Sequence, residues 1–113
     1  MIASFELEGQ QFTALNGGPL FKFNESVSFQ VMCETQEEVD WFWEKLGDGG
    51  DPKAQQCGWL KDRFGLSWQV VPAELNEMVS DPKSAGSQRA MSAMLAMKKL
   101  DLAELKRAYA GQG

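Results

Sequence analysis

Residues 57–72 have the sequence CGWLKDRFGLSWQVVP, which specifies the fold more clearly than any other part of the chain. They predict two short strands, residues 56–61 and 66–71, joined by a turn at residues 62–65. Gly65 can take the positive φ that a tight turn often requires. The stretch is therefore a β-hairpin, and the proline at its end should stop the ladder because it has no backbone donor.

Each strand of this hairpin contains a tryptophan, Trp59 or Trp68, so the hairpin supplies much of the large apolar surface. Gln69 is a long polar side chain between Trp68 and Val70. Alternation along a strand places it on the opposite face from both neighbours. A buried amide needs a hydrogen-bond partner. Two interpretations stay open: Gln69 bonds to neighbouring groups inside the protein, or it lines a ligand cavity.

The pattern Asp-x-x-Gly-x-x-apolar-(Glu/Gln)-apolar, from Asp62 to Val70, resembles the closing hairpin of the vicinal oxygen chelate superfamily. That superfamily includes glyoxalase I, extradiol dioxygenases and bleomycin- or fosfomycin-resistance proteins. The blocks ALNGGP, FKFNESVSF, CETQEEVDWFWEKL and MLAMKKLDLAELKRAYAG look closer to one branch. This is the PhnB-like branch, often labelled demethylubiquinone methyltransferase-like. The resemblance covers essentially the whole chain.

Composition predicts one globular domain, residues 1–113. Hydrophobic residues make up 43% of the chain, with seven Phe and four Trp, which argues against disorder. The net charge of −5, with basic residues spread along the sequence, excludes a basic patch for nucleic acid or an anionic membrane. No apolar run approaches bilayer length, and the N-terminus lacks a signal pattern. Two cysteines are expected to be free thiols in the cytoplasm.

The remaining pattern predicts the order strand, strand, strand, helix, strand, strand, then helices. Strands are expected at residues 2–7, 11–15 and 26–32. Thr35 and Glu38 form a capping box that begins a helix. Apolar residues at helical spacing give that helix one buried stripe: Val39, Phe42, Trp43 and Leu46.

Three helices should follow the hairpin. The first covers residues 73–79, and the second begins at the Asp81-Pro82 pair and ends near Lys99. Asp101 caps the third, in which Leu102, Leu105 and Tyr109 share a face.

The resemblance implies an α+β fold built from βαβββ modules that form a cup-shaped mixed sheet. Residues 26–72 correspond to the second module, residues 1–16 to a remnant hairpin of the first, and residues 73–110 to C-terminal helices. The resemblance implies that the opening strand, helix and second strand of the first module are missing from this chain. A half-built cup leaves strand edges and an apolar face exposed.

We therefore expect a homodimer, possibly with exchanged elements, and an apolar interface above roughly 2,000 Å². The candidate interface residues are Phe5, Phe12, Trp59, Met91, Met94 and Leu95. The methionines at helical spacing have a simpler explanation as ordinary packing within one chain.

The resemblance also bears on metal binding. Ser26 stands where the second module commonly has His, and Gln69 where it has Glu. The chain contains no histidine. Serine and a neutral amide are poor ligands for Zn, Fe or Ni, and Glu6, Glu8 and Glu25 would suit only a weak hard-cation site. We expect no tight catalytic metal.

Other catalytic arrangements find little support in the residues. Without histidine there is no Ser-His or Cys-His pair and no His general base. The glycines at 17–18 and 47–50 lack the strand-to-helix context of a methyl-donor or nucleotide loop. No cofactor is expected, and the sequence leaves open whether the protein is an enzyme.

The favoured hypothesis is a small-molecule binding protein with an aromatic-lined cavity and no catalytic metal. One alternative is a metal-assisted enzyme, a lyase, dioxygenase or transferase, that uses a weakly held divalent ion. Another is a protein that serves only in assembly. Phe21 and Phe23 have a second interpretation, in which they seal the end of a sheet. The cavity candidates are Phe12, Asn16, Phe21, Phe23, Phe29, Trp59, Trp68 and Gln69.

Overall fold

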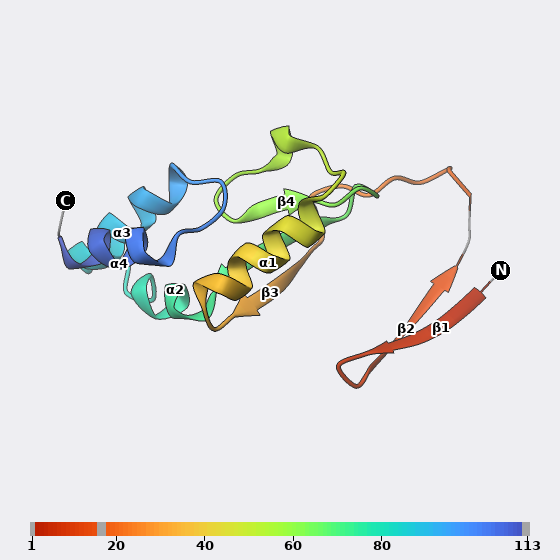
Figure 1. The fold of residues 1–113 in the computed structure, drawn as a ribbon, viewed down its shortest axis with the longest axis horizontal. Helices are drawn as coiled ribbons and strands as arrows, with labels where there is room; N and C mark the ends of the chain where they lie inside the picture. The colour runs from red at the N-terminus through yellow and green to blue at the C-terminus, as the bar shows by residue number, and fades with distance from the viewer. Residues whose placement is uncertain (1, 16–17, 112–113) are drawn as a thin grey trace.

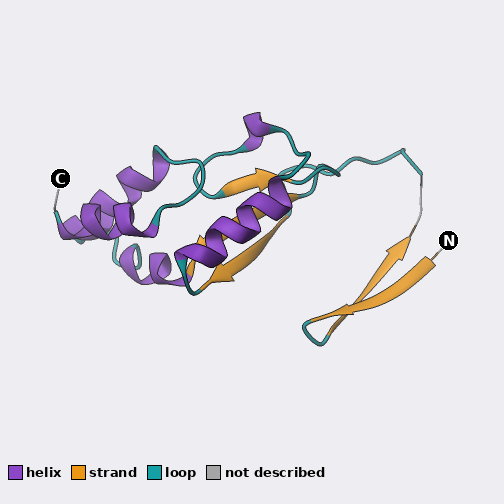
Figure 2. Ribbon diagram, in the orientation of Figure 1, coloured by secondary structure: helices purple, strands orange, loops and turns teal. Residues whose placement is uncertain are grey.

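A computed structural model describes residues 2–15 and 18–111 and has the expected α+β architecture (Figures 1 and 2). Its strands form two sheets. Strand β1 (Ile2–Leu7) pairs with β2 (Gln10–Leu15), and the second sheet has the order β3 (Ser28–Cys33), β5 (Ser67–Pro72), β4 (Trp59–Lys61). The helices are α1 (Gln36–Gly47), the 3₁₀ turn η1 (Pro52–Ala54), α2 (Ala73–Met78), α3 (Ala85–Leu95) and α4 (Leu102–Ala110).

The three-stranded sheet is mixed, and α1 covers one of its faces. Strand β3 runs parallel to β5, and β4 runs antiparallel to it. The Thr35 half of the predicted capping box is confirmed, because the Glu38 N–H donates to Thr35 Oγ1 at 3.2 Å, whereas the Glu38 carboxylate accepts the N–H of Glu34 rather than that of Thr35. The predicted stripe of α1 is confirmed too. It packs on a core made by alternate residues of the sheet, with Cys33, Val39, Leu60 and Val70 fully buried.

The C-terminal helices form a second core with the other face of the sheet. Leu100 and Leu105 are completely buried at its centre. Around them pack Val71 from β5 and residues of α2, α3 and α4, namely Leu75, Met78, Ala90 and Leu102. Ser84 caps the N-terminus of α3, and Asp101 caps the N-terminus of α4 as predicted. These helices are therefore packed on the sheet through a shared apolar core.

The segment between α3 and α4, residues 96–101, ties the two cores together, and we call it the strap. Its carbonyls at Met97 and Lys98 accept the backbone N–H groups of Cys57 and Gly58, each at 2.8 Å. The Gln36 amide donates to Leu100 O at 3.0 Å and accepts the Leu102 N–H at 2.7 Å. The strap thus bonds to both the hairpin and the start of α1.

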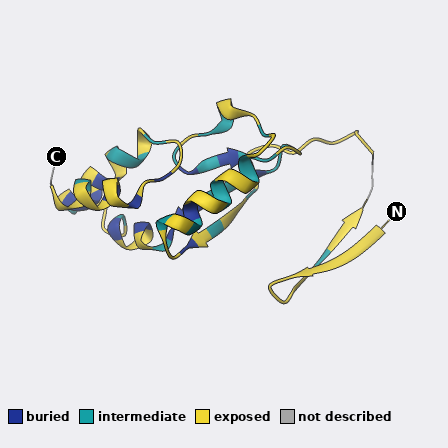
Figure 3. Ribbon diagram, in the orientation of Figure 1, coloured by how far each residue is buried: buried dark blue, intermediate teal, exposed yellow. Residues whose placement is uncertain are grey.

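The β1–β2 hairpin stands apart from the rest of the molecule (Figure 1). Every described residue in it is exposed except Phe12, which is half-buried (Figure 3). Phe5 and Phe12 lie opposite each other and stack, with ring centroids 5.5 Å apart. Alternation gives the hairpin one apolar face, which holds these rings and Leu7. The other face is polar along most of its length and ends in the Ile2–Leu15 pair. The described part of this chain covers neither face.

Two strand predictions are corrected by local turns. The predicted strand at residues 56–61 is interrupted, because Cys57 and Gly58 have φ of 51° and 86° and form a tight turn that pairs Gln56 with Trp59. The strand predicted from residue 26 begins at Ser28 instead. The Asn24 side chain accepts hydrogen bonds from the Ser26 N–H and hydroxyl, and this turn delays the strand.

The second C-terminal helix is also shorter than predicted at both ends. Asp81 caps a turn by accepting the Lys83 N–H at 3.0 Å, and the helix starts at Ala85 after a cap from Ser84. It ends at Leu95 rather than near Lys99, because the following carbonyls accept hydrogen bonds from the Cys57-Gly58 turn. Tertiary bonds override the helical periodicity of the sequence here.

Candidate functional site

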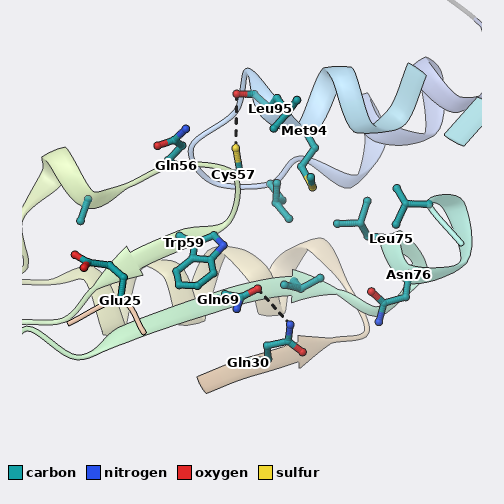
Figure 4. A pocket seen from close by; sticks show the side chains of 14 residues that line it. Glu25, Gln30, Gln56, Cys57, Trp59, Gln69, Leu75, Asn76, Met94 and Leu95 are labelled. Carbon is teal, nitrogen blue, oxygen red and sulfur yellow. Dashed lines mark hydrogen bonds between the residues drawn. The ribbon is translucent and has the colours of Figure 1, made fainter. Parts of the chain in front are cut away.

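A cavity of about 660 Å³ lies on the face of the sheet opposite α1 (Figure 4). The sheet forms one wall, and α2, α3 and the strap form the other. This second wall is mostly apolar and contains the amide of Asn76 on α2. Its apolar residues are Leu75, Val79, Met94, Leu95 and Leu100, with Val71 of β5 beside them. The volume is in the range of pockets that bury a small organic molecule.

The sheet wall of the cavity contains a chain of hydrogen bonds between neutral side chains. Gln30 and Gln69 are cross-strand partners on β3 and β5. The Gln30 Nε2–H donates to Gln69 Oε1 at 3.2 Å, and the Gln69 Nε2–H donates to Ser28 Oγ at 2.8 Å (Figure 4). The Gln69 amide is therefore both partnered and part of the cavity wall, so the two interpretations of this residue hold together.

Glu25 is the carboxylate among the lining residues, and it is paired. The Lys61 ammonium forms an ion pair with it, and this hydrogen bond lowers the pKa of Glu25 below its usual value. Because the Glu25 side chain is largely exposed, the pair is screened by solvent. The cavity consequently presents a neutralised carboxylate at its mouth.

Two of the predicted cavity residues lie together here. Trp59 and Gln69 are aligned across β4 and β5, and both line the cavity. Phe29 and Trp68 lie on the opposite, α1 face, with ring centroids 5.4 Å apart. The Trp68 indole N–H donates to Asp62 Oδ2 at 2.9 Å, which fixes that ring beside the turn.

The remaining predicted cavity residues lie elsewhere. Phe21 and Phe23 line a separate hollow of about 500 Å³ with Phe64 and Lys61. Phe12 is on the β1–β2 hairpin, and Asn16 falls outside the described residues. The eight predicted residues thus do not form one cavity within this chain, because strand alternation and the separate hairpin divide them among different surfaces.

The apolar wall was not predicted as part of a site. Met94 and Leu95, which were predicted as candidates for a subunit interface, line this cavity. Their helical spacing predicts that they share one face of a helix, but it does not predict that the strap holds α3 against the sheet.

Comparison with known families agrees with this architecture. The family model for 3-demethylubiquinone-9 3-methyltransferase, a glyoxalase-type family of the vicinal oxygen chelate superfamily, matches residues 1–71. The chain belongs to this family. The expected resemblance to the PhnB-like branch is thereby confirmed over residues 1–71, but the match does not support the expected loss of the opening part of the first module. No curated protein matches the chain significantly.

In this member of the 3-demethylubiquinone-9 3-methyltransferase family, the residues at the metal-ligand positions of the superfamily show whether a metal site is present. At the expected ligand positions, Ser26 donates to Asn24, and the Gln69 amide is engaged by Gln30 and Ser28. Within residues 2–15 and 18–111, no three His, Cys, Asp or Glu side chains are placed to share a metal ion. Neutral oxygen donors do not fit a tight transition-metal site.

The two cysteines of this family member differ in accessibility, and both are free thiols as predicted. Cys57 is partly exposed at the cavity, and its Sγ–H donates to Leu95 O at 3.6 Å (Figure 4). Cys33 is 1% exposed. Burial, with a smaller contribution from Glu38, raises the pKa of the Cys33 thiol. Only Cys57 is placed for attack by a reagent from solvent.

Titration with a disulfide reagent under native conditions should therefore show one fast and one slow thiol. Cys57→Ser should remove the fast phase, and Cys33→Ser should remove the slow one. In denaturant both thiols should react at similar rates, since the difference comes from burial. Two equal native rates would contradict the placement of Cys33 in the core.

Gln69→Leu should change the free energy of unfolding by no more than about 1–2 kcal/mol, because it removes a partnered amide while adding apolar surface. Ser28 and Gln30 are not fully buried, so water can replace the lost partner. Urea denaturation measures the change. A much larger loss would show that the amide chain is a structural anchor rather than a cavity wall.

In the part of the chain that the structure describes, no helix is long and apolar enough to cross a membrane.

Proposed function

We propose that this protein binds a small molecule in the cavity between the sheet and the C-terminal helices, without a tight catalytic metal. The observation that supports this is the cavity itself, with an apolar wall facing the amides of Gln30 and Gln69. Ligand sites in proteins commonly combine apolar walls with a few convergent polar groups. Free thiols and an acidic surface are compatible with a cytoplasmic location, which we also propose.

The alternative is a metal-assisted enzyme that uses a weakly held divalent ion. Glu25 favours it, because this carboxylate lines the cavity mouth and hard cations prefer oxygen ligands. An ion there would compete with Lys61, which already pairs with Glu25. This competition makes the alternative the weaker proposal.

Elemental analysis after dialysis against a chelator should find no near-stoichiometric Zn, Fe, Ni or Mn. Calorimetric titration with Mn, Ni and Zn should give weak binding at most, and mass spectrometry of the protein as purified should show a co-purified organic molecule. A retained stoichiometric metal would overturn the proposal. Glu25→Gln is the matched variant, because it tests whether any weak metal binding depends on that carboxylate.

We also propose that the protein is a homodimer in which each hairpin docks on the other chain. One chain presents two uncovered apolar surfaces: the Phe5–Phe12 face of the hairpin, and a patch that is 60–88% exposed at Phe21, Phe23 and Phe64. The hairpin, Ile2–Leu15, contains Glu6 and Glu8 and no basic residue. The aromatic patch has lysine and arginine beside it, at Lys22, Lys61 and Arg63.

Lys61 and Arg63 pair with Glu25 and Asp48 within the chain, so Lys22 is the cation of the patch that can face the acidic hairpin. Two apolar surfaces on one chain, one acidic and one containing this lysine, favour reciprocal pairing of two copies. Each copy would then cover the aromatic patch of the other with the aromatic face of its hairpin. Four other residues stay candidates for this interface, because they are exposed or line the open cavity: Trp59, Met91, Met94 and Leu95. The hairpin and the patch are the main contact surfaces of this proposal.

A further inference from the structure

The cavity has two chemically different sides, and neither offers an unpaired charge. Glu25 is paired with Lys61 at the mouth. The other polar groups on the lining are amides, the indole of Trp59 and the thiol of Cys57. A carboxylate, phosphate or ammonium moved from water into such a site would lose hydration without gaining a counter-charge.

The polar side has free hydrogen-bonding capacity for a neutral group. Each amide nitrogen of Gln30 and Gln69 carries two hydrogens, and only one of each is used in the chain to Ser28. The indole N–H of Trp59 makes no hydrogen bond to the other residues drawn around the cavity, and Figure 4 shows its ring nitrogen toward the space between the sheet and α3. These three are donors, so they match an acceptor oxygen.

The opposite side matches an apolar chain or ring. Leu75 lies there on α2, and Met94 and Leu95 lie on α3 (Figure 4). Val79, directly after α2, also lines this side. Leu95 is 61% exposed in the free protein. An apolar group placed against these side chains would gain about 25 cal/mol for each Å² removed from water.

From this arrangement we infer that the cavity takes an uncharged amphipathic molecule. A carbonyl or hydroxyl oxygen accepts from Trp59 and Gln69 at the sheet, and an apolar tail lies against Leu75 and Met94. This inference rests on the proposed small-molecule function and specifies its ligand class.

The test uses the full chain and three probes with similar tails: 2-undecanone, decanoate and decylammonium, each below its aggregation concentration. Calorimetry gives the affinities, and the Trp59 indole ¹H–¹⁵N resonance, assigned with Trp59→Phe, reports the contact. The ketone should bind at least about tenfold more tightly than either ion and should shift that resonance. Tighter or equal binding of an ion would overturn the ligand class.

Met94→Glu should weaken ketone binding by at least about tenfold, because it places a charge on the apolar wall. Met91→Glu is the matched control: it lies one turn earlier on α3, is 39% exposed and does not line the cavity. Far-UV circular dichroism checks that both variants fold. If Met94→Glu does not fold, Met94→Leu is used instead, and it should retain ketone binding because it keeps the wall apolar. Equal effects of the two charged variants, or no binding of any probe, would overturn the inference.

The outcomes separate this inference from the proposed function. Tight binding of decanoate or decylammonium at Trp59 would leave a small-molecule site with a different ligand class. A stoichiometric metal in the purified protein, with no probe bound, would remove the proposed function itself.

Discussion

Replacing Gly58 by alanine is expected to lower the free energy of unfolding by about 3 kcal/mol, a large part of the stability of a small domain. Gly58 has φ of 86°, a conformation that costs any L-residue energy. A Cβ built there would also lie 3.0 Å from Leu100 Cδ1 and 3.3 Å from Val70 O. Leu100 is completely buried and cannot move aside freely.

The backbone of Gly58 makes the effect larger. Its N–H donates to Lys98 O and its carbonyl accepts the Val70 N–H, both at 2.8 Å. A shift that relieves the side-chain contact would therefore weaken the bonds that hold the strap and the sheet together.

Gly65→Ala is the matched control for this prediction. Gly65 has nearly the same φ, 88°, but nothing lies within 4 Å of its built Cβ. Its substitution should cost only the backbone strain, about 1 kcal/mol. Urea denaturation of the two variants, read by tryptophan fluorescence, measures the difference. Equal losses would show that the contact with Leu100 contributes nothing.

Phe5→Asp is expected to convert the dimer to a monomer at low micromolar concentration, as measured by light scattering. Phe5 stacks on Phe12 in the uncovered apolar face of the hairpin and is 45% exposed in one chain. In the proposed dimer this face is buried against the aromatic patch of the partner. A carboxylate there would lose its hydration without a partner, and we expect the affinity to fall by at least about 30-fold.

Thr13→Asp provides the comparison, because it introduces the same side chain on the polar face of the same hairpin. It pairs with Ser4 and is exposed. Its effect on dimer affinity should be small, whereas any loss of strand propensity should be similar in both variants. A wild-type protein that is a well-folded monomer at this concentration would refute the dimer and with it the docking of the hairpin.

Sequence patterns predicted a helix or strand correctly where residues close in sequence determine it. The Thr35 cap, the stripe of α1 and the alternation of β5 are set by neighbouring residues, and all three predictions are confirmed. The Cys57-Gly58 turn could not be predicted as a break in a strand. Its non-glycine residue has positive φ, and the bonds that hold it come from Met97 and Lys98, about 40 residues later in the sequence.

The candidate site was predicted only in part, for a similar reason. Alternation correctly places Gln69 opposite Trp68, and the structure adds Trp59 beside it. Grouping all the aromatic residues in one cavity ignored that Phe29 shares the α1 face with Trp68. The apolar wall depends on where α2, α3 and the strap lie in space, which neither periodicity nor a resemblance specifies for these residues.

The family match ends at residue 71, and this boundary runs between the two sides of the cavity. The donors of the sheet, Gln30, Trp59 and Gln69, come from the matched part of the chain. The apolar wall, from Leu75 to Leu100, comes after it. In the proposed site, the polar end and the apolar tail of the ligand are therefore recognised by separate segments, so exchanging residues 73–111 between relatives should alter the size of the accepted molecule while its polar end is still recognised.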